Sequence, residues 1–391
     1  MPDTIPNLHQ WERGPKITAI GGGTGLSTML RGLKKYTKNL TAVVTVADDG
    51  GGSGVLRRDI GMPPPGDIRH CMESLANVEP IMERLLTYRF QEGSLAGQSF
   101  GNLILAALNG VTGSFEEAVA QMSQVLAITG RILPVTSADV QLEAVFENGA
   151  RVVGESKIFY CKKQEDCRIR QVRLIPSRPK ALPEAVEAIR EAEMVVLAPG
   201  SLYTSIIPNL LVDGIVEAIR ESRALKIYVC NVMTQEGETE GYTASDHIRA
   251  LFNHSCPGLF DLCLVNDAPI PPSVMRGYTR EGAEPILCDR DACEALGVEV
   301  IIATADGSTG IHGLVTDGMA AVSDYTYLYT CGPEPMLKAV YSACKTSGQF
   351  SFEERMGCGF GACMGCSCKT KYGSKRICKD GPVLEKEEIV W

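Results

Sequence analysis

Four cysteines near the end of the chain have the spacing of an iron–sulfur ligand set. Cys358, Cys363, Cys366 and Cys378 follow one another in the pattern C-x4-C-x2-C-x11-C. This is the plant-type pattern of a [2Fe–2S] cluster, in which two irons are held by four thiolates. The alternative is a four-cysteine zinc site, although zinc usually takes paired short knuckles and only Cys363 and Cys366 form one. Cys368 is interpreted as a spare thiol.

A second group of residues, near the start of the chain, is suited to holding a phosphate. The segment GGGTGLS lies between a predicted buried strand and a predicted helix, and it supplies Gly21, Gly22, Gly23, Thr24, Gly25 and Ser27. Glycine lets the backbone approach a ligand closely, and the free N–H groups at a helix start favour anions. The alternative is a helix that only packs tightly against a strand.

Two adjacent acids follow the next predicted strand. Asp48 and Asp49 precede a second glycine-rich loop, about 25 residues after the first, where dinucleotide folds place a ribose-binding carboxylate. A carboxylate here could also hold Mg²⁺ beside a phosphate. The alternative is a solvated turn, because acids before glycines are common in turns.

Three further segments carry candidate ligands. Asp67 and Arg69 lie at a helix start after PPPG, and Arg69 could pair with a phosphate. Asn102 lies at the start of another predicted helix, as either a cap or a ligand contact. Gly200 and Ser201 follow a predicted strand, at the edge where open α/β sheets bind ligands.

These residues require a scaffold that brings them to one edge. Strand, glycine loop, helix and strand open the chain, as in a doubly wound α/β fold. A mostly helical stretch is predicted over about 67–128. The α/β rhythm then resumes with helices over 182–193, 214–222 and 244–254 and strands over 194–198, 226–232 and 262–265.

A change of period marks an insertion in this scaffold. Residues 131–175 alternate between apolar and polar types and contain Asn148-Gly149 between apolar runs. That dipeptide is a strong β-hairpin signal. The pattern therefore predicts a small antiparallel insertion.

Net charge and the distribution of apolar residues exclude several classes of protein. The 391 residues carry a net charge of −9, which argues against nucleic acid as the main partner. No apolar run is long enough for a membrane span, and the leader over 1–15 lacks the pattern of a secretory signal. We therefore expect a cytoplasmic protein whose fifteen cysteines are reduced. The oligomeric state does not follow from the sequence.

The motifs of the first 299 residues resemble one family. In order along the chain they are GGGTGLS, VTVADDGG, PPPGDIR, GNL, APGSLYTSIIPNLLV, CNVMTQEGETEGYTASDH and YTREGAEP. Over residues 16–299 they resemble the CofD-like family, and its bacterial gluconeogenesis factor branch most closely. The resemblance implies a Rossmann-like, doubly wound parallel sheet with a cleft for a nucleotide-containing ligand. Archaeal-type members transfer a phospholactyl group to a deazaflavin, whereas the bacterial branch is similar to binders of UDP-sugars that affect cell shape.

The resemblance also implies binding positions beyond the glycine loop. They are Asp48, Asp49, Asp67, Arg69, Asn102, Gly200, Ser201, Asn231 and Tyr278. Tyr278 is expected to stack on a base or sugar, or else to be a surface-helix aromatic. Gly52 stands where the family usually has Ser, and Gln98 stands near a usual His, which weakens a role in acid–base chemistry. The family's closing segment is missing beyond Val300.

The last 92 residues resemble a different protein class. ATADGSTGIHGLVTDG, CGPEPM, EERMGCGFGACMGC and CKDGPV resemble the electron-transfer subunit of NAD-dependent dihydroorotate dehydrogenase. Residues 300–345 correspond to part of a ferredoxin-reductase-like nicotinamide domain and residues 346–391 to its [2Fe–2S] segment. The FAD barrel that precedes these parts in the family is not recognisable. FAD is therefore not expected within this chain, and the cluster would need a flavoprotein partner.

Three hypotheses about function follow. The first is a UDP-sugar-binding regulatory protein joined to a truncated iron–sulfur module. The second is a phospholactate-type transferase that uses Mg²⁺ at Asp48 or Asp49. The third is electron transfer for pyrimidine synthesis.

Overall fold

The structure, a computed structural model, describes residues 14–165, 167–266, 272–280, 282–298, 303–304, 311–312, 328–332, 334–344, 346–352, 367–376 and 383–390. The chain divides into two compact units, Met1–Val300 and Ile301–Trp391. None of the described helices is both long and apolar enough to cross a bilayer.

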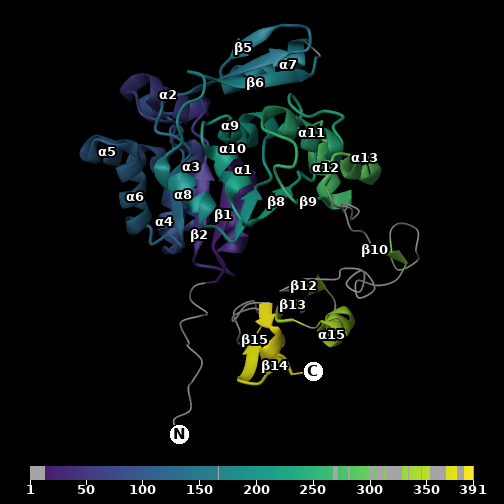
Figure 1. Ribbon diagram of the computed structural model, residues 1–391. Helices are drawn as coiled ribbons and strands as arrows, with labels where there is room; N and C mark the ends of the chain where they lie inside the picture. Colours follow the sequence, from purple (N-terminus) through teal and green to yellow (C-terminus); the bar gives the residue numbers. More distant parts are fainter. Residues whose placement is uncertain are drawn as a thin grey trace. The chain divides into compact units, whose positions relative to one another are not determined.

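A six-stranded parallel sheet forms the centre of the first unit (Figure 1). Its spatial order is β3-β2-β1-β7-β8-β9. The strands are β1 (Ile17–Gly21), β2 (Leu40–Val44), β3 (Arg131–Pro134), β7 (Met194–Leu197), β8 (Leu225–Val229) and β9 (Leu262–Leu264). The first strand therefore lies in the middle, and the chain winds outward from it in both directions. This is the doubly wound, Rossmann-like order that the sequence predicts.

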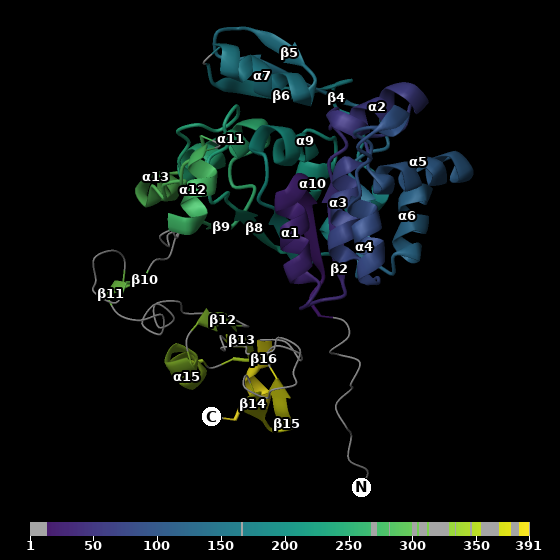
Figure 2. The ribbon, with the colours of Figure 1, turned by 180° about the vertical axis from the view of Figure 1, so that it is seen from behind.

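Helices cover both faces of the sheet. They are α1 (Gly23–Leu33), α2 (Gly51–Ile60), α3 (Gly66–Leu75), α4 (Pro80–Thr87), α5 (Phe100–Thr112), α6 (Phe115–Val125), α8 (Pro183–Arg190), α9 (Ile207–Leu210), α10 (Ile215–Glu221), α11 (Ala244–His254), α12 (Pro272–Arg280) and α13 (Arg290–Ala295). In Figure 2, α1, α3 and α4 lie in front of the sheet. Thr18 of β1 points to the other face, where its hydroxyl donates to the carbonyl of Ala188 in α8.

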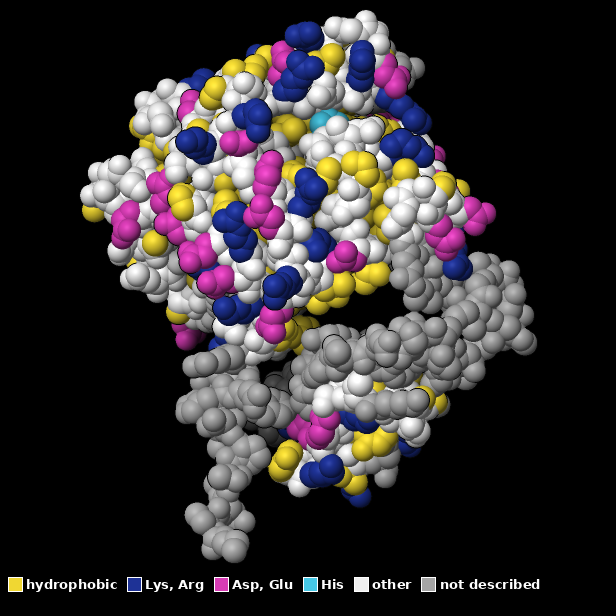
Figure 3. Space-filling model, viewed as in Figure 1, with side chains coloured by type: hydrophobic (Ala, Val, Ile, Leu, Met, Phe, Trp, Pro, Cys, Tyr) yellow, Lys and Arg dark blue, Asp and Glu magenta, His cyan; other side chains and the backbone are white. Residues whose placement is uncertain are grey.

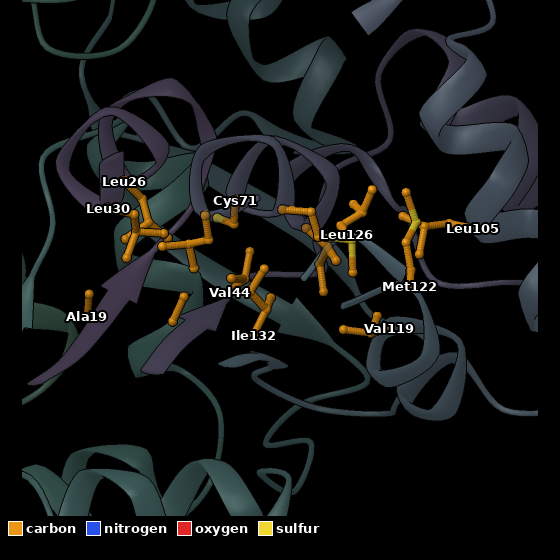
Figure 4. Close-up of a cluster of buried hydrophobic side chains, with 14 of the residues drawn as sticks. Ala19, Leu26, Leu30, Val44, Cys71, Leu105, Val119, Met122, Leu126 and Ile132 are labelled. Atoms are coloured by element: carbon orange, nitrogen blue, oxygen red, sulfur yellow. The ribbon is translucent and has the colours of Figure 1, made fainter. Parts of the chain in front are cut away.

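The main core lies between the sheet and α1, α3, α5 and α6 (Figure 4). Ala19 and Val44 face it from the sheet, and Leu26, Leu30 and Met122 face it from helices. All five are at most 1% exposed. Burial of a Leu-sized side chain stabilises a fold by about 1.5–3 kcal/mol, so this layer holds α1 and the loop before it against β1.

Between α6 and α8 the structure corrects one predicted boundary. Residues 131–134 form β3, which pairs in parallel with β2 and belongs to the main sheet, not to the insertion. The insertion is the three-stranded sheet β5-β4-β6, made of β4 (Gln141–Phe146), β5 (Arg151–Val153) and β6 (Ile169–Ile175). It also contains a helix, α7 (Glu155–Glu165), that the alternating pattern did not predict.

The predicted hairpin is present. β4 and β5 are antiparallel, and Gly149 adopts a φ of +87° between them. The backbone N–H of Ala150 donates to the side chain of Asn148, 2.9 Å away. The Asn-Gly pair thus makes the turn for the reason given from sequence, because glycine accepts a positive φ without strain.

The second unit is built from short elements. Parallel strands β12 (Leu328–Gly332) and β13 (Gly348–Phe352) are joined through α15 (Glu334–Ala343), and β16 (Val383–Glu385) pairs antiparallel to β13. A hairpin joins β14 (Ser367–Thr370) to β15 (Gly373–Arg376). The short parallel pair of β10 (Ala303–Thr304) and β11 (Ile311–His312) and the one-turn helix η4 (Lys386–Glu388) are the other described elements of this unit.

Candidate functional site: a groove at the switch point of the sheet

The strand order reverses between β1 and β7, which are neighbours in the sheet although far apart in sequence. Chains leaving these two strands diverge, and open α/β sheets bind their ligands in the crevice that results. The glycine loop follows β1, and the turn with Gly200 follows β7. The two loops touch closely, since a Cβ on Gly25 would lie 2.1 Å from the carbonyl oxygen of Pro199.

A groove of about 600 Å³ lies at this crevice. Its lining contains seven residues predicted from sequence, namely Gly23, Thr24, Gly25, Gly200, Ser201, Asn231 and Tyr278. Residues that sequence reasoning did not single out complete it: Pro199, Ser205, Val232, Met233, Thr234, Gln235, Glu236 and Ala283. Ligand pockets of proteins commonly measure 300–1,000 Å³, so the groove has room for a nucleotide-sized molecule.

The start of α1 supplies backbone donors to this region. Gly22 is the N-cap and offers no side chain, so no side-chain cap satisfies the first turn. Gly23 adopts a φ of +64°, which favours glycine. Ser27 lies one turn further along, and its hydroxyl donates to the carbonyl of Thr24. The N–H of Gly23 donates to the side chain of Asp67. Since the first N–H groups of a helix lack partners within it, those that follow Gly23 are available to an anion in the groove.

An amide side chain fixes the opposite wall. The N–H of Gly200 donates to the Asn231 side-chain oxygen at 2.8 Å, and the Asn231 amide nitrogen donates to the Gly200 carbonyl at 2.7 Å. Next to it, the Ser201 hydroxyl donates to Gln235 at 2.8 Å. The turn after β7 is therefore held by side chains that follow β8. Tyr278 of α12 is 40% exposed at the groove, which leaves its ring accessible for stacking.

Two buried carboxylates, those of Asp67 and Asp48, lie near the glycine loop and near each other. The Asp67 side chain packs against Gly22, where a Cβ would lie 2.5 Å from its Oδ2 atom. Burial, reinforced by nearby Asp48, raises the pKa of Asp67 to about 7, although the N–H of Gly23 donates a hydrogen bond to it. Burial also raises the pKa of Asp48. Asp67 therefore contacts the glycine loop, and Asp48 lies close enough to Asp67 for its charge to act on that carboxyl.

Asp49 is directed elsewhere. Its Oδ1 atom accepts a hydrogen bond of 2.8 Å from the backbone N–H of Ser156 in the first turn of α7. A Cβ on Gly154 would lie 2.5 Å from its Oδ2 atom. Asp49 therefore acts as a cap for the helix of the insertion. Its neighbour Asp48 instead accepts a hydrogen bond from the N–H of Gly50 and lies against Gly66 at the start of α3.

Arg69 and Asn102 also lie together, but as a buried, hydrogen-bonded pair. The Arg69 Nε atom donates to the Asn102 side chain at 2.9 Å, and its other nitrogens contact Glu73 and His70. Neither Arg69 nor Asn102 lines the groove. The cap of α5 is Ser99, whose hydroxyl accepts from the backbone N–H of Asn102, so the interpretation of Asn102 as a cap is wrong.

Several buried polar residues near the groove were missed. Asn209, fully buried, donates to the carbonyls of Gly21 and Ser205 and so ties the glycine loop to α9. Glu238 accepts from the N–H of Tyr203, and burial raises its pKa to about 7. Burial and the surrounding carboxylates also raise the pKa of Glu155, at the start of α7. Asn209 and Glu238 lie within motifs recognised in the sequence, but their roles required the positions of distant backbone groups.

The two departures from the family pattern are in contact. A Cβ on Gly52 would lie 2.7 Å from the Oε1 atom of Gln98. Gln98 is 7% exposed and occupies the space that a side chain on Gly52 would need. The two residues therefore fit each other.

Among the described residues, no three His, Cys, Asp or Glu side chains are arranged to hold a metal ion. The predicted cluster ligands Cys358, Cys363, Cys366 and Cys378 lie outside the described residues. The donor set itself, four thiolates in plant-type spacing, fits an iron–sulfur cluster.

Comparison with known proteins identifies both parts of the chain. Residues 17–305 match the family model of 2-phospho-L-lactate transferase CofD. The chain belongs to the CofD family. Residues 353–390 match the iron–sulfur cluster binding domain of dihydroorotate dehydrogenase B, so the chain also carries an iron–sulfur binding domain.

Within the CofD family, the chain is similar to gluconeogenesis factors. The gluconeogenesis factor of Bacillus subtilis is 50% identical over 288 residues, which cover 73% of this chain and 90% of that protein. The gluconeogenesis factor of Halalkalibacterium halodurans is 48% identical over 286 residues, covering 73% of this chain and 88% of that protein. A crystal structure of a UPF0052 family member from Bacillus halodurans has a TM-score of 0.70 at 48% identity, covering 73% of this chain and 91% of that one.

Proposed function

We propose that this CofD-family chain binds a nucleotide sugar, of the UDP-sugar class, in the groove between α1 and the turn after β7. The observation that carries the proposal is the groove itself, which combines a glycine-rich helix start with the glycine turn after β7 at the switch point of the sheet. The first-turn N–H groups of α1 that follow Gly23 would hold the diphosphate. Tyr278 would stack on the base or sugar, and the amides of Asn231 and Gln235 lie where ligand hydroxyl groups could pair with them.

A binding role is favoured over catalysis by the chemistry of the lining. Apart from hydroxyl groups, its ionisable side chains are Glu236 and Tyr278, and it contains no histidine. We therefore propose a regulatory protein whose ligand reports the supply of sugar nucleotides, with effects on carbon metabolism and cell shape. The carbon-metabolism part of this proposal is supported by the similarity to gluconeogenesis factors.

Titration calorimetry with UDP-N-acetylglucosamine tests the proposal. We expect saturable binding at one site per chain, and weaker binding of UMP, which lacks the second phosphate and the sugar. Absence of heat together with an unchanged melting temperature at high ligand concentration would reject it.

A second candidate is transfer of a phosphoryl-linked group, as the description of the family implies. The buried pair Asp48 and Asp67 favours it, because Mg²⁺ usually takes one or two carboxylates and completes its shell with ligand phosphates and water. Incubation with a guanylyl-lactate donor, a deazaflavin acceptor and Mg²⁺ should then give a transferred product. Lack of transfer under conditions where the UDP-sugar binds would leave only the first proposal.

For the second unit we propose a [2Fe–2S] cluster on Cys358, Cys363, Cys366 and Cys378. It would relay electrons of the kind used in pyrimidine synthesis, and a flavoprotein partner would supply the flavin. The cluster would contribute one-electron transfer, and the four thiolates would hold it. We further propose a cytoplasmic location, where the remaining thiols stay reduced.

A further inference from the structure

The insertion carries a concentration of positive charge that the proposed nucleotide site does not use. Between residues 151 and 180 the sequence has nine Lys and Arg against three Asp and Glu, in a chain of net charge −9. Figure 3 shows Lys and Arg side chains gathered over the insertion, with few acids among them.

Four of these basic side chains are exposed and unneutralised. Arg151 of β5, Lys157 of α7 and Arg170 and Arg173 of β6 are all exposed. Arg173 donates to the neutral amide of Gln171, and within the described ranges no ion pair joins any of the four to an acid. Glu143, opposite Arg173 in the sheet, is the nearest cross-strand acid. Four fixed positive charges on one small subdomain create a field that attracts an anionic partner.

Large apolar side chains share the surface of the insertion. Tyr160 of α7 is 66% exposed, and Ile175 at the end of β6 is 41% exposed. Exposed Tyr and Arg together are typical of protein–protein interfaces, where they form the residues that contribute most to binding. A nucleic acid could pair its phosphates with the positive charges of the insertion. The acidic remainder of the chain would, however, repel its other phosphates.

We infer that the basic insertion surface, formed by Arg151, Lys157, Tyr160, Arg170, Arg173 and Ile175, is a docking site for an acidic protein segment with apolar anchors. Acidic side chains of the partner would pair with the arginines, and an apolar side chain would cover Tyr160 or Ile175. The surface is also connected to the candidate site. Asp49 caps α7, whose first residue, Glu155, lies close enough to Asp48 and Asp67 for their charges to act on it.

Fluorescence anisotropy on the full chain provides the test. The probe is a fluorescein-labelled peptide in which glutamate pairs alternate with leucines. We expect saturable binding that weakens as salt rises toward about 0.3 M, because exposed charges are then screened. The double variant Arg170→Glu/Arg173→Glu should raise the Kd by at least about tenfold.

The matched control is Arg220→Glu/Arg223→Glu, which makes the same change of charge at exposed positions at and beyond the end of α10. It should alter the Kd by less than about twofold, since long-range charge alone is screened. Circular dichroism checks that both variants keep the fold. The inference is overturned if the unmodified chain does not bind the peptide, or if both variants lose binding equally. Tighter binding of a single-stranded oligonucleotide or of phosphatidylserine vesicles would overturn it as well.

Discussion

Asn231 and Gly200 hold each other through two hydrogen bonds, of 2.8 and 2.7 Å, in which one amide side chain satisfies both backbone groups of one glycine. The wall of the groove therefore depends on a side chain from the neighbouring strand. In Asn231→Ala both backbone groups lose their partner, and we expect UDP-N-acetylglucosamine to bind at least about tenfold more weakly, with about 1–3 kcal/mol lost in stability.

The control for that variant is Asn77→Ala. Asn77 also donates two side-chain hydrogen bonds, to Ala127 and Thr129, but it lies outside the groove lining. Calorimetry should show unchanged affinity for Asn77→Ala. Equal losses of affinity in both variants would mean that the Asn231 effect reflects general destabilisation.

Gly25 is where α1 meets the turn after β7. In Gly25→Ala the new Cβ would lie 2.1 Å from the Pro199 carbonyl oxygen, so one of the two loops must move. We expect a loss of about 2–4 kcal/mol in the free energy of unfolding and loss of ligand binding. Gly32→Ala, in the same helix, meets no atom within 4 Å and should stabilise the protein by up to about 1 kcal/mol. Urea denaturation of both variants checks the contrast.

Asp67 should make stability depend on pH. Its pKa is about 7 in the folded chain, raised by burial, whereas an unfolded Asp titrates near 4. Between these values the folded state binds more protons, so this contribution to stability is complete below about pH 4 and is lost as pH rises through 7. Asp67→Asn removes this pH dependence, so the stability of the variant relative to the unmodified chain should increase by on the order of 4 kcal/mol from pH 4 to pH 8.

Thermal denaturation across that pH range measures the effect. Asp59→Asn, at an exposed position near the end of α2, provides the comparison. A pH profile that Asp67→Asn leaves unchanged would show that the carboxyl ionises normally and that the loop holds it in a polar setting.

Gly52 and Gln98 should be coupled energetically. A side chain on Gly52 displaces the end of the flexible Gln98 side chain, so Gly52→Ala should cost about 1 kcal/mol. In a Gln98→Ala background the space is free, and the same change should cost little. A double-mutant cycle from urea denaturation gives the coupling energy, and a value near zero would separate the two positions.

Two serine variants, at Cys358 and at Cys368, distinguish a proposed cluster ligand from the proposed spare thiol. Cys358→Ser should abolish the visible absorption and lower the iron content of anaerobically purified protein, because each iron needs two thiolates. Cys368→Ser should leave both unchanged. Metal analysis that finds zinc without iron would replace the [2Fe–2S] proposal with the four-cysteine zinc alternative.

Much of the architecture follows from local patterns. The apolar run before Gly21, the periodic helices and Asn148-Gly149 predict the parallel sheet and the hairpin, because each signal depends on near neighbours in sequence. The assignment of residues 131–134 to the insertion was wrong. The sequence pattern of one short strand is the same whether the strand belongs to the main parallel sheet or to the sheet of the insertion. The helix at Glu155–Glu165 was missed because it directly follows an alternating segment and has little amphipathic contrast.

The site was predictable in its backbone and less so in its side chains. Glycines reveal the loops on both walls of the groove, since their role is local. The different directions of Asp48 and Asp49, and the burial of Arg69 against Asn102, depend on segments that arrive from distant parts of the chain. Those arrangements are properties of tertiary packing, which adjacent sequence does not encode.

The central position of β1 has a consequence for synthesis of the chain. The N–H of Lys16, just before β1, bonds to Glu193, 177 residues further along, and β1 pairs with β7 immediately beyond that point. While the intervening residues emerge from the ribosome, one side of β1 has no strand to pair with. The proposed binding groove, whose walls follow β1 and β7, therefore cannot form until the second half of the unit has been made. A ribosome-bound fragment ending before β7 would expose an unpaired, apolar strand to chaperones or aggregation.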